Sequence, residues 1–370
     1  KINTQLKFNI HSSIESYKKA FLNHPNKQTK VFLSPEFISV FYNNHKKGIE
    51  HVFLDFEEKS DKGIIYAQIF KIGGFQINNY HTKHKLKKRI IHFILGLFKF
   101  RILGFGNNFL TNEPTISVTK NLRNPSNFIL QITNLLSVKK KVNKFIFPDH
   151  FFETIGVNDP KKTYPKLIRL EVDEEMYMDI DSKWKSFQNY KESLNKKYKK
   201  RLKNVFSKSK SITIKILNNK EILEYESQMQ LLFNNVRESS SFYSIPFNVK
   251  SYIEFEKTKD LTSNVYGCFL KEKLVGFCSE WIIDKKLYSY FIGLNYKINQ
   301  SHSLYERILY HIIESGINSQ VRKIIFGRTA AEFKSNVGAV PKKSFIYIYI
   351  KNPILRLILR PILSVVKPKK

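Results

Sequence analysis

The chain is poor in the residues that stabilise small extracellular domains and metal centres. Its 370 residues include only two cysteines, Cys268 and Cys278. A disulfide framework needs several cysteine pairs, and a structural zinc site needs about four ligands at short spacing, so the sequence predicts neither. We therefore expect a reducing, cytoplasmic setting and no bound metal.

Long apolar runs are also scarce. The stretch IIHFILGLF at 90–98 is about half the roughly 20 residues that a spanning helix needs, so no transmembrane helix is expected. The chain does not open with a charged region, an apolar core and a small-residue cleavage site, so we expect no signal peptide.

Acidic residues are few beside basic ones, 31 against 63, which gives a formal net charge of +32. Such a charge favours polyanionic partners, either nucleic acid or an acidic lipid surface. The chain is also rich in Asn, Ile, Phe and Tyr, as expected from an AT-rich genome, and the lysine excess has that alternative origin. No stretch resembles an established nucleic-acid module, so we expect no DNA partner.

Two segments repeat a pattern 179 residues apart. VNKFIF at 142–147 and VRKIIF at 321–326 share four residues at matching positions, and each follows an amphipathic helical stretch. Runs rich in β-branched and aromatic residues precede each helix, as in HVFLDFE and KLVGFCSEWII, which predicts antiparallel strands. The order of elements indicates two tandem α/β lobes related by duplication.

The domain ranges follow from this repeat. We predict an N-terminal lobe at 1–165, a C-terminal lobe at 166–350 and a basic amphipathic tail at 351–370. The second lobe should begin with a long basic helix at 183–207, because apolar residues recur there at spacings of three and four among lysines.

Three stretches carry a family resemblance: RILGFGNNFLTNEP at 101–114, WKSFQNYKESLNKKYKKRLKN at 184–204, and FGRTAAEFKSNVGAVP at 326–341. They resemble the double GNAT-fold acyltransferases that include the FemABX-type peptidoglycan aminoacyltransferases. The resemblance implies two GNAT-like lobes, each a mostly antiparallel mixed sheet flanked by helices. It also implies N-acyl transfer from a thioester carrier to the amine of a lipid or cell-envelope precursor, with a sphingoid-like or amino-acid amine as acceptor.

The donor is open at this stage. Acetyl-CoA enzymes of this fold hold the pyrophosphate in a glycine-rich loop, whereas the corresponding segment here, KINQSHS at 297–303, lacks glycine. The co-substrate is therefore acyl-CoA bound differently or an acyl carrier protein, with no tightly bound cofactor. The alternatives are an aminoacyl-tRNA-dependent FemABX-type transferase and an inactive membrane adaptor.

The candidate catalytic groups must deprotonate an ammonium and stabilise an oxyanion. Lys334 is the candidate for the oxyanion, and Glu332 or Glu280 for the base. Tyr296 is a candidate for protonating the leaving thiolate. The other interpretation is a solvated turn in which Glu332 pairs with Lys334, and a Glu280 that faces water at a sheet edge.

Further residues are candidates for binding substrate or carrier. Most lie where a strand ends or inside the stretches that carry the resemblance; they are Gly327, Arg328, Thr329, Asp149, Asn108 and Arg201. For Asp149, which precedes His150, a purely structural role is the alternative.

Two stretches favour the inner face of an anionic membrane. KLKKRIIHFILGLFKFRILGF at 85–105 and NPILRLILRPILSVVKPKK at the C-terminus mix cations with apolar residues, as interfacial helices do. Asn352 and Pro353 should start the second helix, and Pro361 should kink or end it. Docking of both helices on the protein core is the alternative.

Overall fold

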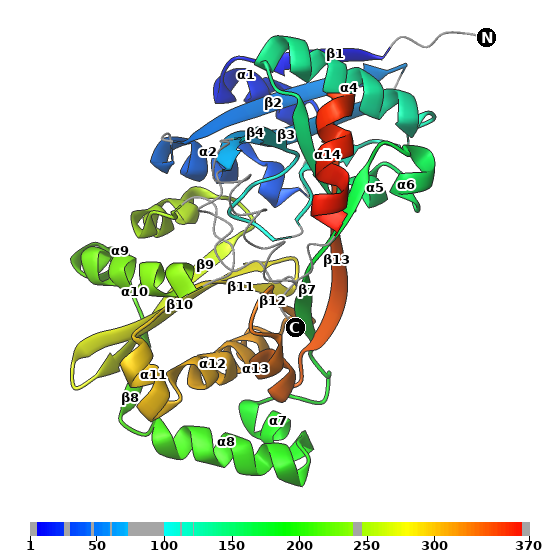
Figure 1. Ribbon diagram of the computed structural model, residues 1–370. Helices are drawn as coiled ribbons and strands as arrows, with labels where there is room; N and C mark the ends of the chain where they lie inside the picture. The colour runs from blue at the N-terminus through cyan, green and yellow to red at the C-terminus, as the bar shows by residue number, and fades with distance from the viewer. Residues whose placement is uncertain are drawn as a thin grey trace. The chain divides into compact units, whose positions relative to one another are not determined.

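A computed structural model describes residues 6–25, 30–45, 48–59, 61–72, 100–111, 113–120, 122–239 and 246–364 (Figure 1). The chain forms two compact units. Unit 1 comprises residues 1–173, 241–247 and 344–370, and unit 2 comprises residues 174–240 and 248–343. Most of the stretch at 85–105 lies outside the described residues; its last part forms strand β4.

Unit 1 contains strands with helices between them along the chain. Its elements are β1 (Lys7–His11), α1 (Ile14–Leu22), η2 (Val31–Leu33), α2 (Pro35–Asn44), β2 (Ile49–Glu58), β3 (Asp61–Ile72), β4 (Phe100–Gly104), β5 (Ile116–Val118), α4 (Pro125–Lys140), β6 (Lys144–Pro148), α5 (Asp149–Thr154), α6 (Pro160–Thr163), the first half of β7 (Ile168–Asp179), the end of β13 (Val340–Ile350) and α14 (Pro353–Ser364).

Unit 2 contains the end of β7 and the start of β13. Its other elements are α7 (Phe187–Ser193), α8 (Lys196–Lys208), β8 (Ile212–Ile216), α9 (Asn219–Glu224), α10 (Glu226–Ser239), η4 (Val249–Lys257), β9 (Thr262–Leu270), β10 (Lys273–Ile283), β11 (Lys286–Leu294), α11 (Tyr296–His302), α12 (Leu304–Asn318), β12 (Lys323–Gly327) and α13 (Ala331–Asn336).

The strands of the two units share one pairing pattern. Unit 1 has the order β1-β2-β3-β4-β6-β13, with β5 on the side of β3, and unit 2 has the order β8-β9-β10-β11-β12-β7. Every pair is antiparallel except one in each unit, β4 with β6 and β11 with β12. The repeated strands β6 and β12 occupy the same place, which confirms the tandem arrangement expected from the sequence.

The strand that follows β6 or β12 in the order of each unit comes from the other half of the chain. Strand β7 enters unit 2 with residues 176–179 paired to β12, while residues 346–350 of β13 pair with β6 in unit 1. Unit 1 is therefore completed by the last strand of the chain. Strand pairing at such sequence separation leaves no local signal, because period and propensity describe single segments.

The basic stretch at 183–207 is not one helix, which corrects that prediction. Ser186 caps α7 by accepting from the N–H of Asn189, the backbone is extended at Leu194, and Asn195 caps α8 by accepting from the N–H of Tyr198. Side-chain caps start helices, so the two polar residues divide a continuous apolar face into two shorter helices.

In unit 2, helices cover both faces of the sheet (Figure 1). Residues such as Cys278 on β10 face α12 and pack in the main core of this unit. Ser279 faces the other side, where its hydroxyl lies 2.9 Å from the hydroxyl of Tyr252 in η4. Strand β10 is thus buried on both faces, as a central strand should be.

Candidate functional site

Strands β11 and β12 of unit 2 pair over a short stretch only. Three parallel pairs join them, from Lys286 with Lys323 to Tyr288 with Ile325. Strand β11 then continues to Leu294 without β12 beside it, so the strands diverge toward their carboxyl ends. Diverging strands leave backbone groups that a bound molecule can satisfy, since every buried peptide group needs a partner.

Lys334 fixes the carboxyl end of β12. Its side chain is 4% exposed, and Nζ donates to the carbonyl oxygens of Phe326 at 2.8 Å, Gly327 at 3.3 Å and Arg328 at 2.7 Å. An ammonium has three protons, so three bonds of this kind match its number of donors. In this arrangement Lys334 is a positioning residue for the loop; direct action on substrate, as predicted from the sequence, would require these bonds to break.

The loop that Lys334 holds has an unusual backbone. Gly327, Thr329 and Ala330 have φ values of +69°, +68° and +51°. A left-handed conformation is easy for glycine but costly for a β-branched residue such as Thr329. Strain of this kind persists only where the surroundings enforce it, and it clusters at functional sites. The three carbonyl bonds to Lys334 are the enforcing contacts here.

Helix α13 begins without a capping side chain. Its N-cap is Ala330, which has no acceptor to offer. No described residue accepts a hydrogen bond from the backbone N–H of Thr329 or Ala330. A run of N–H groups at a helix start has a positive electrostatic potential, suited to a carbonyl oxygen, an oxyanion or a phosphate. We call residues 327–334 the β12 loop.

The side chains of the β12 loop surround this backbone. Arg328 is half-buried, and Thr329 and Glu332 are exposed. The Lys334 ammonium is turned toward carbonyl oxygens of the loop and is buried, whereas the solvated-turn interpretation expected it in solvent beside Glu332. The structure thus keeps these predicted site residues together, with a lysine that is buried instead of solvated.

Glu280 lies elsewhere, inside unit 2. It is 1% exposed, and its Oε1 accepts from Asn264 at 2.9 Å, Tyr266 at 3.0 Å and Ser315 at 2.7 Å. The alternative interpretation, in which Glu280 faces water at a sheet edge, is therefore wrong. Burial raises the pKa of this carboxyl group, although the three hydrogen bonds act in the opposite direction. Being enclosed, Glu280 is poorly placed to accept a proton from a bound amine.

A Glu280→Gln variant tests this placement. The raised pKa means that the folded state keeps the proton at a pH where the unfolded chain has lost it. The wild type should therefore lose stability as pH rises through the interval between the unfolded and the folded pKa, while the glutamine variant should not. Urea unfolding at several pH values measures this trend. We expect transferase activity to change by about twofold at most, whereas a general base would lose far more.

Tyr296 and its neighbours form a helix where the sequence suggested a loop. Asn295 caps α11 by accepting from the N–H groups of Lys297 and Ile298, and the Tyr296 hydroxyl lies 2.5 Å from the hydroxyl of Ser239. Asn299 Oδ1 accepts from the N–H of Tyr305 at 2.7 Å, at the start of α12. In a glycine-rich phosphate loop, an N–H group at this helix start would bind the pyrophosphate. Here the N–H of Tyr305 already donates to Asn299.

Arg201 joins two helices of unit 2. Its Nε and Nη2 lie 2.9 and 2.8 Å from Oε1 of Glu306, so this arginine ties α8 to α12. The rest of α8 is strongly basic, with six lysines and no acidic residue in its sequence. The structure gives Arg201 a packing role and leaves the lysines as the cationic surface of this helix.

Asp149 has a structural environment in unit 1. Its Oδ1 accepts from the N–H of His150 at 2.9 Å, and its Oδ2 accepts from the N–H of Phe345 on β13 at 3.1 Å. The carboxylate thus links the end of β6 to the closing strand. This fits the structural alternative considered for Asp149 from the sequence.

Asn108 belongs to a buried polar network that the sequence did not suggest. Its backbone N–H and its side-chain amide donate to Oε1 of Gln68 at 2.8 and 2.9 Å. Gln68 Nε2 donates to the Tyr66 hydroxyl at 2.7 Å, and that hydroxyl lies 2.6 Å from Nδ1 of His51. Burial lowers the pKa of His51 to about 4, so the imidazole is neutral at pH 7. The only hint in the sequence is Gln68, a polar residue inside the apolar run of β3.

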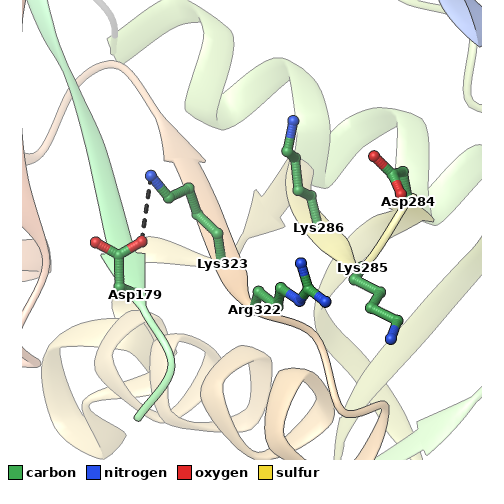
Figure 2. Close-up of a pocket in the computed structure, with 6 residues that line it drawn as sticks. All are labelled: Asp179, Asp284, Lys285, Lys286, Arg322 and Lys323. Atoms are coloured by element: carbon green, nitrogen blue, oxygen red, sulfur yellow. Dashed lines mark ion pairs between the residues drawn. The ribbon is translucent and has the colours of Figure 1, made fainter. Parts of the chain in front are cut away.

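A polar hollow lies at the opposite end of β11 and β12 from the β12 loop (Figure 2). It measures about 280 Å³ and is lined by Asp179, Asp284, Lys285, Lys286, Arg322 and Lys323. The Lys323 ammonium pairs with Asp179 at 3.2 Å. Every residue on its wall is charged, unlike the mostly hydrophobic and aromatic side chains that line small-molecule pockets.

Two further features are settled for the described part of the chain. No three residues among its histidines, cysteines, aspartates and glutamates gather at a point where they would hold a metal ion. None of its helices combines the length and the apolar character needed to cross a bilayer.

Comparisons with known proteins support the fold. No protein-family model and no curated protein matches the sequence. A tandem GNAT protein from the clavulanic acid biosynthesis pathway superposes with a TM-score of 0.52 at 8% identity, covering 94% of this chain and 99% of that one. FemX gives a TM-score of 0.48 at 8% identity, with 96% and 100% covered, and L-PGS from Bacillus licheniformis gives 0.43 at 11%, with 82% and 86% covered.

The chain therefore has a tandem GNAT fold, as the resemblance implied. At 8% identity the likeness to the clavulanic acid pathway protein defines the fold alone. Function depends on the chemistry of the site, because one fold serves many functions.

Proposed function

We propose that this protein is an N-acyltransferase that moves an acyl group from a thioester carrier to the amine of a lipid or cell-envelope precursor. The observation that carries the proposal is the β12 loop. The backbone N–H groups of Thr329 and Ala330 have no described partner. On the other side of the loop, Lys334 holds the carbonyl oxygens of Phe326 and Arg328 in place. Preorganised N–H donors are what a developing oxyanion needs.

The reaction would proceed by direct attack. The neutral amine forms a C–N bond to the carbonyl carbon, and the carbonyl oxygen becomes an oxyanion that accepts from the N–H groups of the β12 loop. The C–S bond then breaks, the thiolate leaves, and the proton lost by the amine neutralises it. Arg328 would bind a phosphate or carboxylate of the carrier or acceptor, since a guanidinium matches both in geometry.

The segment before α12 bears on the choice of acyl carrier. Helix α11 replaces an open phosphate loop, and Asn299 satisfies the N–H of Tyr305. A pyrophosphate held at this helix start would have to displace that asparagine. An acyl carrier protein, or acyl-CoA bound in another way, therefore suits the proposal better.

An aminoacyl-tRNA donor is the second candidate, and helix α8 favours it. The six lysines of α8 form a cationic surface without acidic residues, and such surfaces bind nucleic-acid phosphates. This would make the protein a peptidoglycan aminoacyltransferase of FemABX type.

Purified protein incubated with an amine acceptor and one donor at a time separates these candidates. The donors are a long-chain acyl-CoA, an acylated carrier protein and aminoacylated tRNA, and mass spectrometry identifies the product. An acyl amide from either thioester supports the first proposal; product only from charged tRNA supports the second. No product with any donor would favour an inactive adaptor.

Two arginines at opposite ends of β12 provide a matched pair for this assay. Arg328 follows the strand at the β12 loop, and Arg322 precedes it at the polar hollow. We expect Arg328→Ala to lower kcat/KM roughly 10- to 100-fold and Arg322→Ala to change it by about twofold at most. Equal effects would remove the assignment of Arg328.

A further inference from the structure

The C-terminal helix α14 has two apolar faces, and only one is used inside unit 1. Leu359 is 7% exposed and packs with Ile168, Leu170 and Ile350, with Leu355 and Leu363 beside it. These three leucines recur every four residues and form the inner face of the helix. The alternative considered from the sequence, docking of this segment on the core, holds for this face.

The opposite face is apolar as well. Ile354, Leu357 and Ile358 are 70%, 76% and 53% exposed, and their spacing of three and four places them on one stripe. We call these three residues the outer stripe. Large aliphatic side chains grouped in this way on a soluble surface mark a site of interaction.

The charged residues of the segment 351–364 are all positive. Lys351 and Arg360 are exposed, and α14 contains no acidic residue. Arg356 is engaged differently, because its Nη1 donates to the carbonyl oxygen of Ile350 at 2.9 Å. An apolar stripe flanked by cations matches an anionic bilayer, where aliphatic side chains enter the acyl region and cations meet phosphates.

We propose that the outer stripe of α14 is a docking surface for an anionic phospholipid membrane. The inner leucines anchor the helix to unit 1, and Ile354, Leu357 and Ile358 insert into the lipid interface. The proposal goes beyond acyl transfer, since a chain that binds vesicles without transferring an acyl group would still satisfy it.

Vesicle flotation with the full-length protein tests the proposal. The vesicles are phosphatidylcholine alone or mixed with phosphatidylglycerol. We expect the wild type to bind the mixed vesicles, and the triple variant Ile354→Gln, Leu357→Gln and Ile358→Gln to bind at least about tenfold less. Lys351→Gln with Arg360→Gln should weaken binding to the mixed vesicles and reduce its dependence on salt.

A second triple variant provides the matched control. Leu22, Leu130 and Val138 are also exposed aliphatic residues of unit 1, on α1 and α4. Changing them to glutamine removes apolar surface without changing charge, and binding should persist; circular dichroism checks that each variant is folded.

The proposal is overturned if the wild type does not bind, if the α14 variant binds as the wild type does, or if both triple variants lose binding equally. It is also overturned if light scattering shows a dimer that the α14 changes convert to a monomer while vesicle binding is absent. In that case the outer stripe would bind a second copy of the chain.

Discussion

Replacing Lys334 with alanine is expected to lower the free energy of unfolding by about 3 kcal/mol and to abolish most transferase activity. The variant leaves the carbonyl oxygens of Phe326, Gly327 and Arg328 without the ammonium that they share. It also frees the strained φ of Thr329 to relax, so the N–H groups of the β12 loop would lose their orientation. Urea unfolding and product formation are the two measurements.

Comparing the two measurements separates positioning from direct catalysis. Lys334→Met keeps most of the aliphatic stem and removes the ammonium, so it should lose stability and activity together. Lys343→Ala, at an exposed lysine of the same unit, should leave both unchanged. Lost activity at unchanged stability in the Lys334 variants would show that the ammonium acts on the substrate and that its carbonyl bonds are dispensable.

Gln68→Leu is expected to destabilise unit 1 by about 3 kcal/mol, although the new side chain is apolar and similar in size. Gln68 is fully buried and supplies four hydrogen bonds, which reach Tyr66, Asn107 and Asn108. Leucine offers none of them, so several buried polar groups would have no partner. Thermal and urea unfolding measure the loss.

The network also decides the role of Asn108. If Asn108 serves to hold the loop after β4, Asn108→Ala should lower stability, with any loss of activity following from it. If Asn108 binds the carrier, activity should fall without a change in stability. Gln131→Leu, at a half-buried glutamine on α4, is the control and should cost little. A stable Gln68→Leu protein would contradict the proposed importance of the network.

Much of the fold could be predicted because it depends on residue patterns within single segments. The match between residues 142–147 and 321–326 located two equivalent strands, which the structure places beside β4 and β11 in the same parallel pairing. Runs of β-branched residues located the antiparallel strands before each helix. Period and composition act within one segment, so a single sequence reveals them.

The candidate site was only partly predictable. The residues of the β12 loop are consecutive, so the sequence kept them together, but it could not show that Lys334 turns inward or that Ala330 leaves α13 uncapped. Glu280 stands among apolar neighbours in the sequence, and its burial depends on Ser315 of α12, which is 35 residues away. Such contacts are set by packing between segments.

Charge, the duplicated order of elements and the amphipathic C-terminal segment were determined by the sequence alone, because each is a property of composition or of local periodicity. Tertiary structure decided which strand completes each sheet, which face of α14 is left in solvent, and where the Lys334 ammonium points. These features depend on contacts between distant segments. A buried polar group without a partner costs free energy, and this cost selects one arrangement among several that the local sequence permits equally well.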